Sequence, residues 1–537
     1  MLSYRKLAMR VLGRPLHTEG IDSPRPASQR AAALVLTAAM LTTLAAPAFA
    51  DIWHIENGDI TISAGESGNN VTQNNNTTYG DTNTIITNQN KDKASSHTVT
   101  IETNDKNDKV EVTLKDVNID TSSRNKAAVS VTGSGNTTIK LDGDNALKSD
   151  TYRSGIYGSG SGSLTISGGE NDSLTAQGGS GANGISSSGS LTISGGTVTA
   201  NGDDGGRGIS SSGSVTISGG STVTANGGSG TISGGDGIWS GGGVTISGGS
   251  TVTANGGNGG SLVGGDGIRS GGGLTVSDGT VTAKGGNGDS KDGYGGDGIR
   301  SGGGVTISGN TVNAAGGYGG KVGGYGICSF DRVAISGGTV EAAGGNGSTG
   351  GGSGIYSSVI DLSGSLELTA KAGSPSGRAL SQKGSELVLD TIKDKLGPGA
   401  KVTATDADGK VIDQVSTPRP VEPEESSSSS DGGSAAPSAP ASPLPGLTVT
   451  DKDGQRISYT STQSGNTLTV CVGRFTASFR ISLAALRQLR AEGIETITFQ
   501  TILCSTTLSV DELLAMGGED AEAVLTHRFT DSSLTVG

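Results

Sequence analysis

The chain has 537 residues, of which 95 are glycine, and only 3% of its residues are aromatic. Much glycine with a hydrophobic content of 32% does not suit one large globular enzyme, whose core needs more Leu, Ile and Phe. The formal charge of −13 argues against nucleic acid or anionic lipid as a partner, because both attract basic surfaces. Two alternatives remain, a disordered low-complexity chain or a repeat fold whose turns use the glycine.

The first 50 residues have the pattern of a targeting segment. A basic start precedes an apolar run over 31–50, which ends in Ala48-Phe49-Ala50. This order is typical of a secretory signal peptide, so we predict cleavage before Asp51. The mature protein is then secreted, acidic and not inserted in a membrane. The alternative is a retained membrane-spanning helix, for which the apolar run is barely long enough.

Residues 51–415 are predicted to form a repeat domain, with an N-terminal cap region over 51–126 and coils over 127–395. The cap region is rich in Asn and Thr and contains alternating stretches such as 110–114. A cap is expected because an open strand edge invites pairing with another chain.

The dipeptide Gly-Ile recurs in the glycine-rich part of the chain at intervals of 24 to 31 residues. Its isoleucines are Ile156, Ile185, Ile209, Ile238, Ile268, Ile299, Ile327 and Ile355. Each unit continues with two short alternating stretches, such as Val244 to Ile246 and Val252 to Ala254, and contains no helical window. We therefore predict an all-β fold, a parallel β-helix solenoid with three strands per coil.

In this solenoid, the Ile, Val and Ala of each unit point inward and stack in columns. We assign the Gly-Gly and Ser-Gly pairs to turns that need a positive φ. Phase-locked columns are not expected of a disordered chain, so the repeat fold is favoured. The solenoid also explains the low hydrophobic content, because neighbouring coils complete the burial of sparse aliphatic side chains.

The C-terminal part begins with a Pro-, Ser- and Glu-rich linker over 416–446. Residues 447–537 have an ordinary composition and are predicted to form a small α+β module. Its expected elements are a hairpin around Ser464-Gly465-Asn466, a helix starting at Ser482, a strand over 494–501 and a short helix after Ser509. Whether Cys471 and Cys504 pair stays open.

The chain lacks the usual motifs of enzymes. It has only four histidines, no P-loop, and glycine stretches that do not open a helix. We therefore expect no enzymatic activity and assign no catalytic residue. The nine-residue period of calcium-binding glycine repeats is also absent.

The residue after each Gly-Ile isoleucine is expected to face outward. This column contains Tyr157, Ser186, Ser210, Trp239, Arg269, Arg300, Cys328 and Tyr356. Tyr and Trp present flat faces to sugar rings, and Arg binds carboxylates such as those of uronic acids. The candidate ligand-binding residues are therefore Trp239, Arg269, Arg300, Tyr157 and Tyr356. The alternative is that these are ordinary variable surface residues.

Asp236, Asp266 and Asp297 form a second column, three residues before Trp239, Arg269 and Arg300. Stacked carboxylates repel one another unless a calcium ion or the neighbouring arginines neutralise them. Calcium is thus the only candidate cofactor, and a calcium-dependent polysaccharide lyase is one functional alternative.

A third column repeats Thr-x-Thr at Thr197/Thr199, Thr222/Thr224, Thr251/Thr253 and Thr280/Thr282. This grid resembles the ice-binding faces of some β-solenoid antifreeze proteins, but Asn313 and Glu341 interrupt it. Threonine is also an ordinary exposed residue of strands, and we favour that interpretation.

The segment AAVSVTGSGNTTIKLDGDNAL over 127–147 and the later GIYGSGSGSLTISGG resemble a secreted bacterial family of carbohydrate-binding domain-containing proteins. The resemblance covers about 51–400 and implies a right-handed β-helix, similar in shape to pectate lyases, that binds acidic plant polysaccharide without catalysis, sometimes with calcium. We therefore expect a secreted polysaccharide-binding protein. The alternatives are the lyase and an adhesive surface stalk that presents the C-terminal module.

Overall fold

The structure is a computed structural model. It describes residues 51–418 except Asn310, and residues 446–536 except 451–455, 458, 465, 473–476, 502–504, 517–520 and 528–531. The described residues form two separate compact units, divided between 418 and 446. The predicted signal peptide and most of the predicted linker lie outside the described residues.

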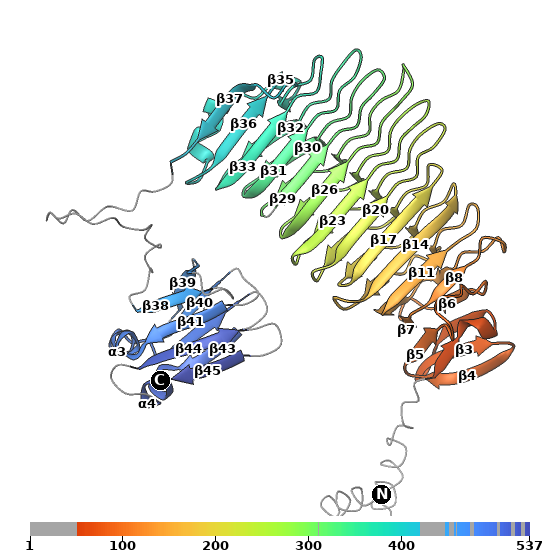
Figure 1. The fold of residues 1–537 in the computed structure, drawn as a ribbon, viewed down its shortest axis with the longest axis horizontal. Helices are drawn as coiled ribbons and strands as arrows, with labels where there is room; N and C mark the ends of the chain where they lie inside the picture. The colour runs from red at the N-terminus through yellow and green to blue at the C-terminus, as the bar shows by residue number, and fades with distance from the viewer. Residues whose placement is uncertain are drawn as a thin grey trace, which may run out of the picture. The chain divides into compact units, whose positions relative to one another are not determined.

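The first unit is a β-solenoid of about 13 turns, so the repeat fold predicted from the sequence is confirmed. Figure 1 shows its strands stacked side by side, with a row of long loops along one edge. The strands align in parallel ladders, in which each strand pairs with its equivalent in the next turn.

Ladder 1 begins each unit at the Gly-Ile position. It contains β2 (Ile60–Gly65), β6 (Val99–Thr103), β9 (Val129–Gly133), β12 (Ile156–Gly158), β15 (Ile185–Ser187), β18 (Ile209–Ser211), β21 (Ile238–Ser240), β24 (Ile268–Ser270), β27 (Ile299–Ser301), β30 (Ile327–Ile335), β32 (Ile355–Leu362) and β34 (Leu380–Gln382).

Ladder 2 follows in each unit, and the second halves of β30 and β32 continue it. It contains β1 (Ile52–His54), β5 (Thr84–Thr87), β7 (Lys109–Lys115), β10 (Asn136–Asp142), β13 (Leu164–Ser167), β16 (Leu191–Ser194), β19 (Val215–Ser218), β22 (Val244–Ile246), β25 (Leu274–Val276) and β28 (Val305–Ile307).

Ladder 3 is a separate 12-stranded sheet. It contains β8 (Asn118–Asp120), β11 (Asp144–Lys148), β14 (Ser173–Ser180), β17 (Thr197–Asp203), β20 (Thr222–Asn226), β23 (Ser250–Asn255), β26 (Gly279–Lys284), β29 (Thr311–Ala315), β31 (Gly338–Ala343), β33 (Leu366–Lys371), β36 (Lys401–Thr405) and β37 (Val411–Ser416).

The predicted isoleucine column stands in register along ladder 1. For example, Ile209 pairs with Ile238 and Ile238 with Ile268, and all eight isoleucines are fully buried. Val244, Ile246, Val252 and Ala254 are buried as predicted. These columns join into one continuous core, so each coil contributes only a few aliphatic side chains.

A column of buried serines closes the core beside the isoleucines. Ser240 and Ser270 lie in register, and each hydroxyl donates to a glycine carbonyl of the previous coil, Gly213 and Gly242, at 2.9 and 3.0 Å. This hydrogen bonding removes the cost of burying a hydroxyl group. The column explains why a serine follows the outward residue in most units.

Glycine pairs between ladder 2 and ladder 3, such as Gly248-Gly249, have positive φ as predicted, whereas the glycine-rich loops between ladder 3 and ladder 1 correct the prediction. The glycine pairs in these loops, such as Gly256-Gly257, do not have positive φ. A Cβ built on Gly257 would overlap the carbonyl oxygen of Gly228 in the previous coil. The amide of Gly257 donates to Gly235 at 2.8 Å, so the loop backbones hydrogen-bond directly to one another. Glycine is needed here for close approach of main chains, not for turn conformation.

Antiparallel strands lie at the two ends of the solenoid. At the N-terminal end, β2 pairs with β3 (Gly68–Gln73), which pairs with β4 (Asn76–Asp81), after a short helix η1 (Ile55–Asn57). The parallel ladders also extend into the predicted cap region, since β2 pairs with β6 and β6 with β9. At the C-terminal end, β37 pairs antiparallel with β36, near β35 (Ser385–Glu386) and η2 (Leu389–Lys395).

The second unit has two four-stranded sheets and two short helices. One sheet contains β38 (Leu447–Thr450), β41 (Ala477–Ser482), β44 (Glu522–His527) and β45 (Ser532–Val536), and the other contains β39 (Thr460–Ser464), β40 (Thr467–Cys471), β42 (Thr496–Gln500) and β43 (Ser505–Ser509). The helices are α3 (Leu483–Ala491) and α4 (Val510–Ala515).

Both helices of the second unit begin at a capping serine. The hydroxyls of Ser482 and Ser509 accept hydrogen bonds from Ala485 and Glu512. A separate core that contains Phe479 and Phe499 holds this unit together. Among the described residues, none of the helices is long and apolar enough to cross a membrane.

Candidate functional site

The three stacked aspartates are buried and form a hydrogen-bonded ladder. The amide of Asp266 donates to Asp236 Oδ1 at 2.9 Å, and the amide of Asp297 donates to Asp266 Oδ1 at 2.7 Å. The amide of Tyr325 completes the series by donating to Asp297 at 2.7 Å. Each carboxylate thus joins its own coil to the next one, which gives this column a structural role.

Arginines pair with the first and last members of the aspartate ladder. Arg207 Nε lies 3.1 Å from Asp236 Oδ2, and Arg300 lies 3.3 Å from Asp297 Oδ2. Among the described residues, no group of three or more His, Cys, Asp and Glu side chains is placed to hold a metal ion. Backbone amides bind all three carboxylates, and arginines pair with Asp236 and Asp297.

Buried Asp266 and Asp297 lie in an environment that disfavours their charged forms. Burial raises its pKa well above the usual value, and the charges of Asp297 and Asp236 raise it further. Burial also raises the pKa of Asp297 to about 6, against the opposing effects of the Tyr325 amide and Arg300. These two carboxyl groups are thus easier to protonate in the folded protein than in the unfolded chain.

The outward column of ladder 1 is in register, from Tyr157 through Trp239 to Tyr356, but its members differ in accessibility. The guanidinium of Arg207 lies 4.4 Å from the centroid of the Trp239 ring. Arg300 contacts Asp297 and lies 5.3 Å from the Phe330 ring. One face of the tryptophan and the arginine fork are therefore already occupied.

Cys328 corrects the expectation that this whole column is accessible, since its side chain is only 1% exposed. It lies in register between Arg300 and Tyr356, and Tyr356 stacks on Tyr325 at 5.0 Å. Larger neighbours thus cover the smaller thiol. Burial also raises the pKa of Cys328 to about 12.

Two predicted ligand-binding residues remain open to solvent. Tyr157 is 42% exposed, and Arg269 is exposed and forms no ion pair with any residue that the structure describes. They lie four coils apart on the same face of ladder 1. This face is therefore the part of the candidate site that sequence reasoning located.

Tyr157 borders a groove of about 310 Å³, which we call the tyrosine groove. Its lining residues are Thr98, Thr100, Asn125, Lys126, Ala127, Ser130, Arg153 and Tyr157. Thr100, Ser130 and Tyr157 are in register, so hydroxyl groups lie next to the ring. Two cationic side chains complete the lining, which combines a flat apolar face with positive charge.

The two cations of the tyrosine groove differ in availability. Lys126 is 2.9 Å from Asp59, which also binds Arg124, and these partners hold the pKa of the Asp59 carboxyl well below its usual range against the effect of burial. The Arg153 side chain donates to the neutral Asn125 side chain at 3.2 Å and forms no ion pair within the described part of the chain. The Arg153 guanidinium is therefore available to bind the carboxylate of a ligand.

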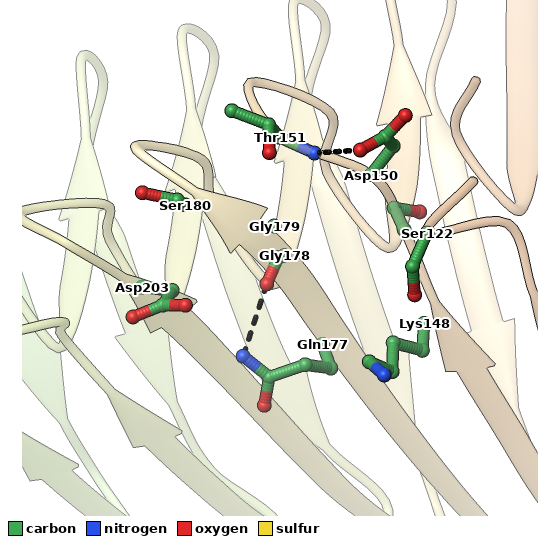
Figure 2. A pocket seen from close by; sticks show the side chains of 10 residues that line it. Ser122, Lys148, Asp150, Thr151, Gln177, Gly178, Gly179, Ser180 and Asp203 are labelled. Carbon is green, nitrogen blue, oxygen red and sulfur yellow. Dashed lines mark hydrogen bonds between the residues drawn. The ribbon is translucent and has the colours of Figure 1, made fainter. Parts of the chain in front are cut away.

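A larger hollow of about 580 Å³ lies at the corner between ladder 3 and ladder 1, and we call it the corner cleft (Figure 2). It is lined by Ser122, Lys148, Ser149, Asp150, Thr151, Gln177, Gly178, Gly179, Ser180 and Asp203. Figure 2 shows that these residues come from neighbouring coils and that polar side chains surround the opening. Hydroxyl, amide and carboxylate groups predominate, as in sites for polar ligands.

Sequence reasoning missed Lys126, Arg153 and all of the corner cleft. The shortest Gly-Ile interval, from Ile185 to Ile209, is no signal of the cleft, because this unit is shortened between ladders 1 and 2 and between ladders 2 and 3, away from the cleft corner. The cleft is assembled from loop residues of successive coils, and the sequence of one unit does not show which of them lie together.

The threonine grid is present on the outer face of ladder 3. Thr197 pairs with Thr222, and Thr222 with Thr251, and the register continues through Thr280 to Thr311. In the second threonine column, Asn313 pairs with Thr282 and Glu341 pairs with Asn313, so these two residues interrupt the grid as predicted.

Comparison with known proteins does not identify a family for this chain. No family model, no curated protein and no solved structure matches this chain. The resemblance to secreted carbohydrate-binding proteins therefore stays a hypothesis, and the argument for function depends on the surface of the solenoid.

Proposed function

We propose that the mature protein is a secreted, non-enzymatic polysaccharide-binding protein, built as a right-handed β-helix with three strands per coil. Its ligand contains uronic acids. The tyrosine groove is the observation that carries this proposal, because an exposed ring, hydroxyl groups and an arginine without an acidic partner lie together. The ring suits the apolar face of a sugar, and the arginine suits a carboxylate.

The repeat supports a polymeric ligand. Adjacent coils are separated by about 4.8 Å, the spacing of paired strands, and an extended surface of this kind can contact several sugar units. Arg269 on the same face offers a second exposed cation farther along the solenoid, and its charge also helps to lower the pKa of Asp297. A protein of net charge −13 repels a polyanion unless such local cations attract it.

The proposal is tested by affinity electrophoresis and pull-down with polygalacturonate and with a neutral polysaccharide. We expect retention by polygalacturonate, and a loss of about tenfold in affinity on Tyr157→Ala or Arg153→Ala, which corresponds to about 1.4 kcal/mol. Tyr79→Ala is the matched control, since Tyr79 is 77% exposed and lies on β4. Absence of retention, or equal retention of all variants, contradicts the proposal.

Three additional measurements separate the alternatives. A chelator arm in the same pull-down tests calcium, whose involvement requires that retention falls when the ion is removed. Ultraviolet absorbance of the polygalacturonate solution tests the lyase, which forms unsaturated product. Binding to a cell-wall or host protein through residues 447–537, without polysaccharide retention, supports the stalk.

A further inference from the structure

The corner cleft lies over connections from ladder 3 to ladder 1 that are shorter than those of the later coils. Seven residues separate Lys148 from Ile156, and seven separate the register-equivalent Gln177 from Ile185. After Asn226 the connection lengthens to the eleven residues 227–237, the first of the long glycine-rich loops. The cleft therefore lies among the short connections that precede these longer loops.

The polar groups of the corner cleft suit a neutral ligand. Asp150 and Asp203 bring two carboxylates, whereas the one lining cation, Lys148, already forms an ion pair with Asp120 at 3.1 Å. Gln177 donates to the carbonyl of Gly178, which leaves its own carbonyl oxygen for a ligand. Carboxylates and amides accept hydrogen bonds from sugar hydroxyls but repel a uronate.

The corner cleft and the tyrosine groove adjoin each other. Asn125 lines the tyrosine groove, and its backbone N–H donates to the carboxylate of Asp150 in the corner cleft. The carbonyl of Arg153, another groove residue, accepts a hydrogen bond of 3.0 Å from Gly179 of the cleft. One short ridge of backbone therefore separates a cationic hollow from an acidic one.

We infer that the corner cleft binds a neutral, hydroxyl-rich sugar unit next to the uronic acid unit in the tyrosine groove. The preferred ligand is then a heteropolysaccharide in which uronic acids neighbour neutral sugars. This inference rests on the proposed function and specifies its ligand class. It assigns Gln177 and Asp203 to hydrogen bonding of the neutral unit.

The test compares oligosaccharides of equal length by isothermal titration calorimetry with the full mature chain. The probes are oligogalacturonate and an alternating oligomer of galacturonic acid and rhamnose. We expect the alternating oligomer to bind about tenfold more tightly, as one or two additional hydrogen bonds would give. Gln177→Ala and Asp203→Asn should abolish this preference and leave oligogalacturonate binding unchanged, whereas Tyr157→Ala should weaken both.

Glu341→Gln is the matched control, because Glu341 is an exposed acid on ladder 3 away from both hollows. Equal affinity for the two oligomers overturns the inference. It is also overturned if both cleft variants keep the preference while Tyr157→Ala weakens binding, an outcome that leaves the proposed function standing. Lack of binding to either probe rejects both. Circular dichroism of each variant shows that the fold is retained.

Discussion

Asp266→Asn should stabilise the protein at neutral pH. Asparagine retains an oxygen that can accept the amide hydrogen of Asp297, the bond that Asp266 makes at 2.7 Å. The substitution replaces a carboxyl group whose ionisation is opposed by burial and by the neighbouring Asp297 and Asp236. The new amide group can also donate toward these neighbouring carboxylates, so both consequences favour the folded state.

The magnitude follows from the pKa of Asp297, which burial raises from an ordinary 3.8 to about 6. One pKa unit corresponds to about 1.4 kcal/mol, so ionising this buried carboxyl costs the fold about 3 kcal/mol. Because the folded pKa is raised, the stabilisation by the bound proton is complete below pH 4. It is lost as the pH rises through 6.

The contribution of Asp266 to stability depends on pH in the same direction, since its pKa is also raised. The variant removes this ionisation cost at Asp266 and lowers the cost at Asp297 by removing repulsion. The cost at Asp297 sets the scale of the effect, so we expect a stabilisation above pH 7 of at most about 3 kcal/mol, equivalent to a rise of up to about 4 °C in melting temperature for a domain of this size.

The assay is thermal unfolding of the mature protein, followed by circular dichroism at pH 4, 5, 6, 7 and 8. The difference between variant and wild type should be smallest at pH 4 and increase toward pH 8. Glu341→Gln, which removes an exposed acid on ladder 3, should show no such increase. A variant that is destabilised at pH 8, or equally stabilised at every pH, refutes the electrostatic reasoning.

Two other predictions concern packing. Gly257→Ala should lower the free energy of unfolding by more than about 2 kcal/mol in a urea titration, because its methyl group would overlap the Gly228 carbonyl. Gly309→Ala is the control and should cost much less, since the nearest atom to its methyl group would be 3.3 Å away. Cys328, 1% exposed and with its pKa raised to about 12 by burial, should react with a maleimide only after unfolding. Half-buried Cys471 serves as the internal comparison by peptide mapping, and rapid labelling of native Cys328 contradicts its burial.

The candidate site was only partly predictable. The exposure of Tyr157 and Arg269 was predicted, because alternation along a strand specifies which side chain faces outward. Trp239 and Cys328 were located on the correct column, but their cover comes from Arg207, Arg300 and Tyr356, which belong to neighbouring coils. Such cover depends on side-chain size across coils, and a single unit does not contain that information.

The sequence by itself determined the repeat and its core. A glycine before each isoleucine and a two-residue alternation specify the inward positions, because strand geometry is local. Only the tertiary structure decided why Gly257 must be glycine, how Asp266 is satisfied, and where the corner cleft lies. These three features depend on what the preceding and following coils place within hydrogen-bonding distance. These contacts form only when coils stack, so the sequence of a single coil does not specify them.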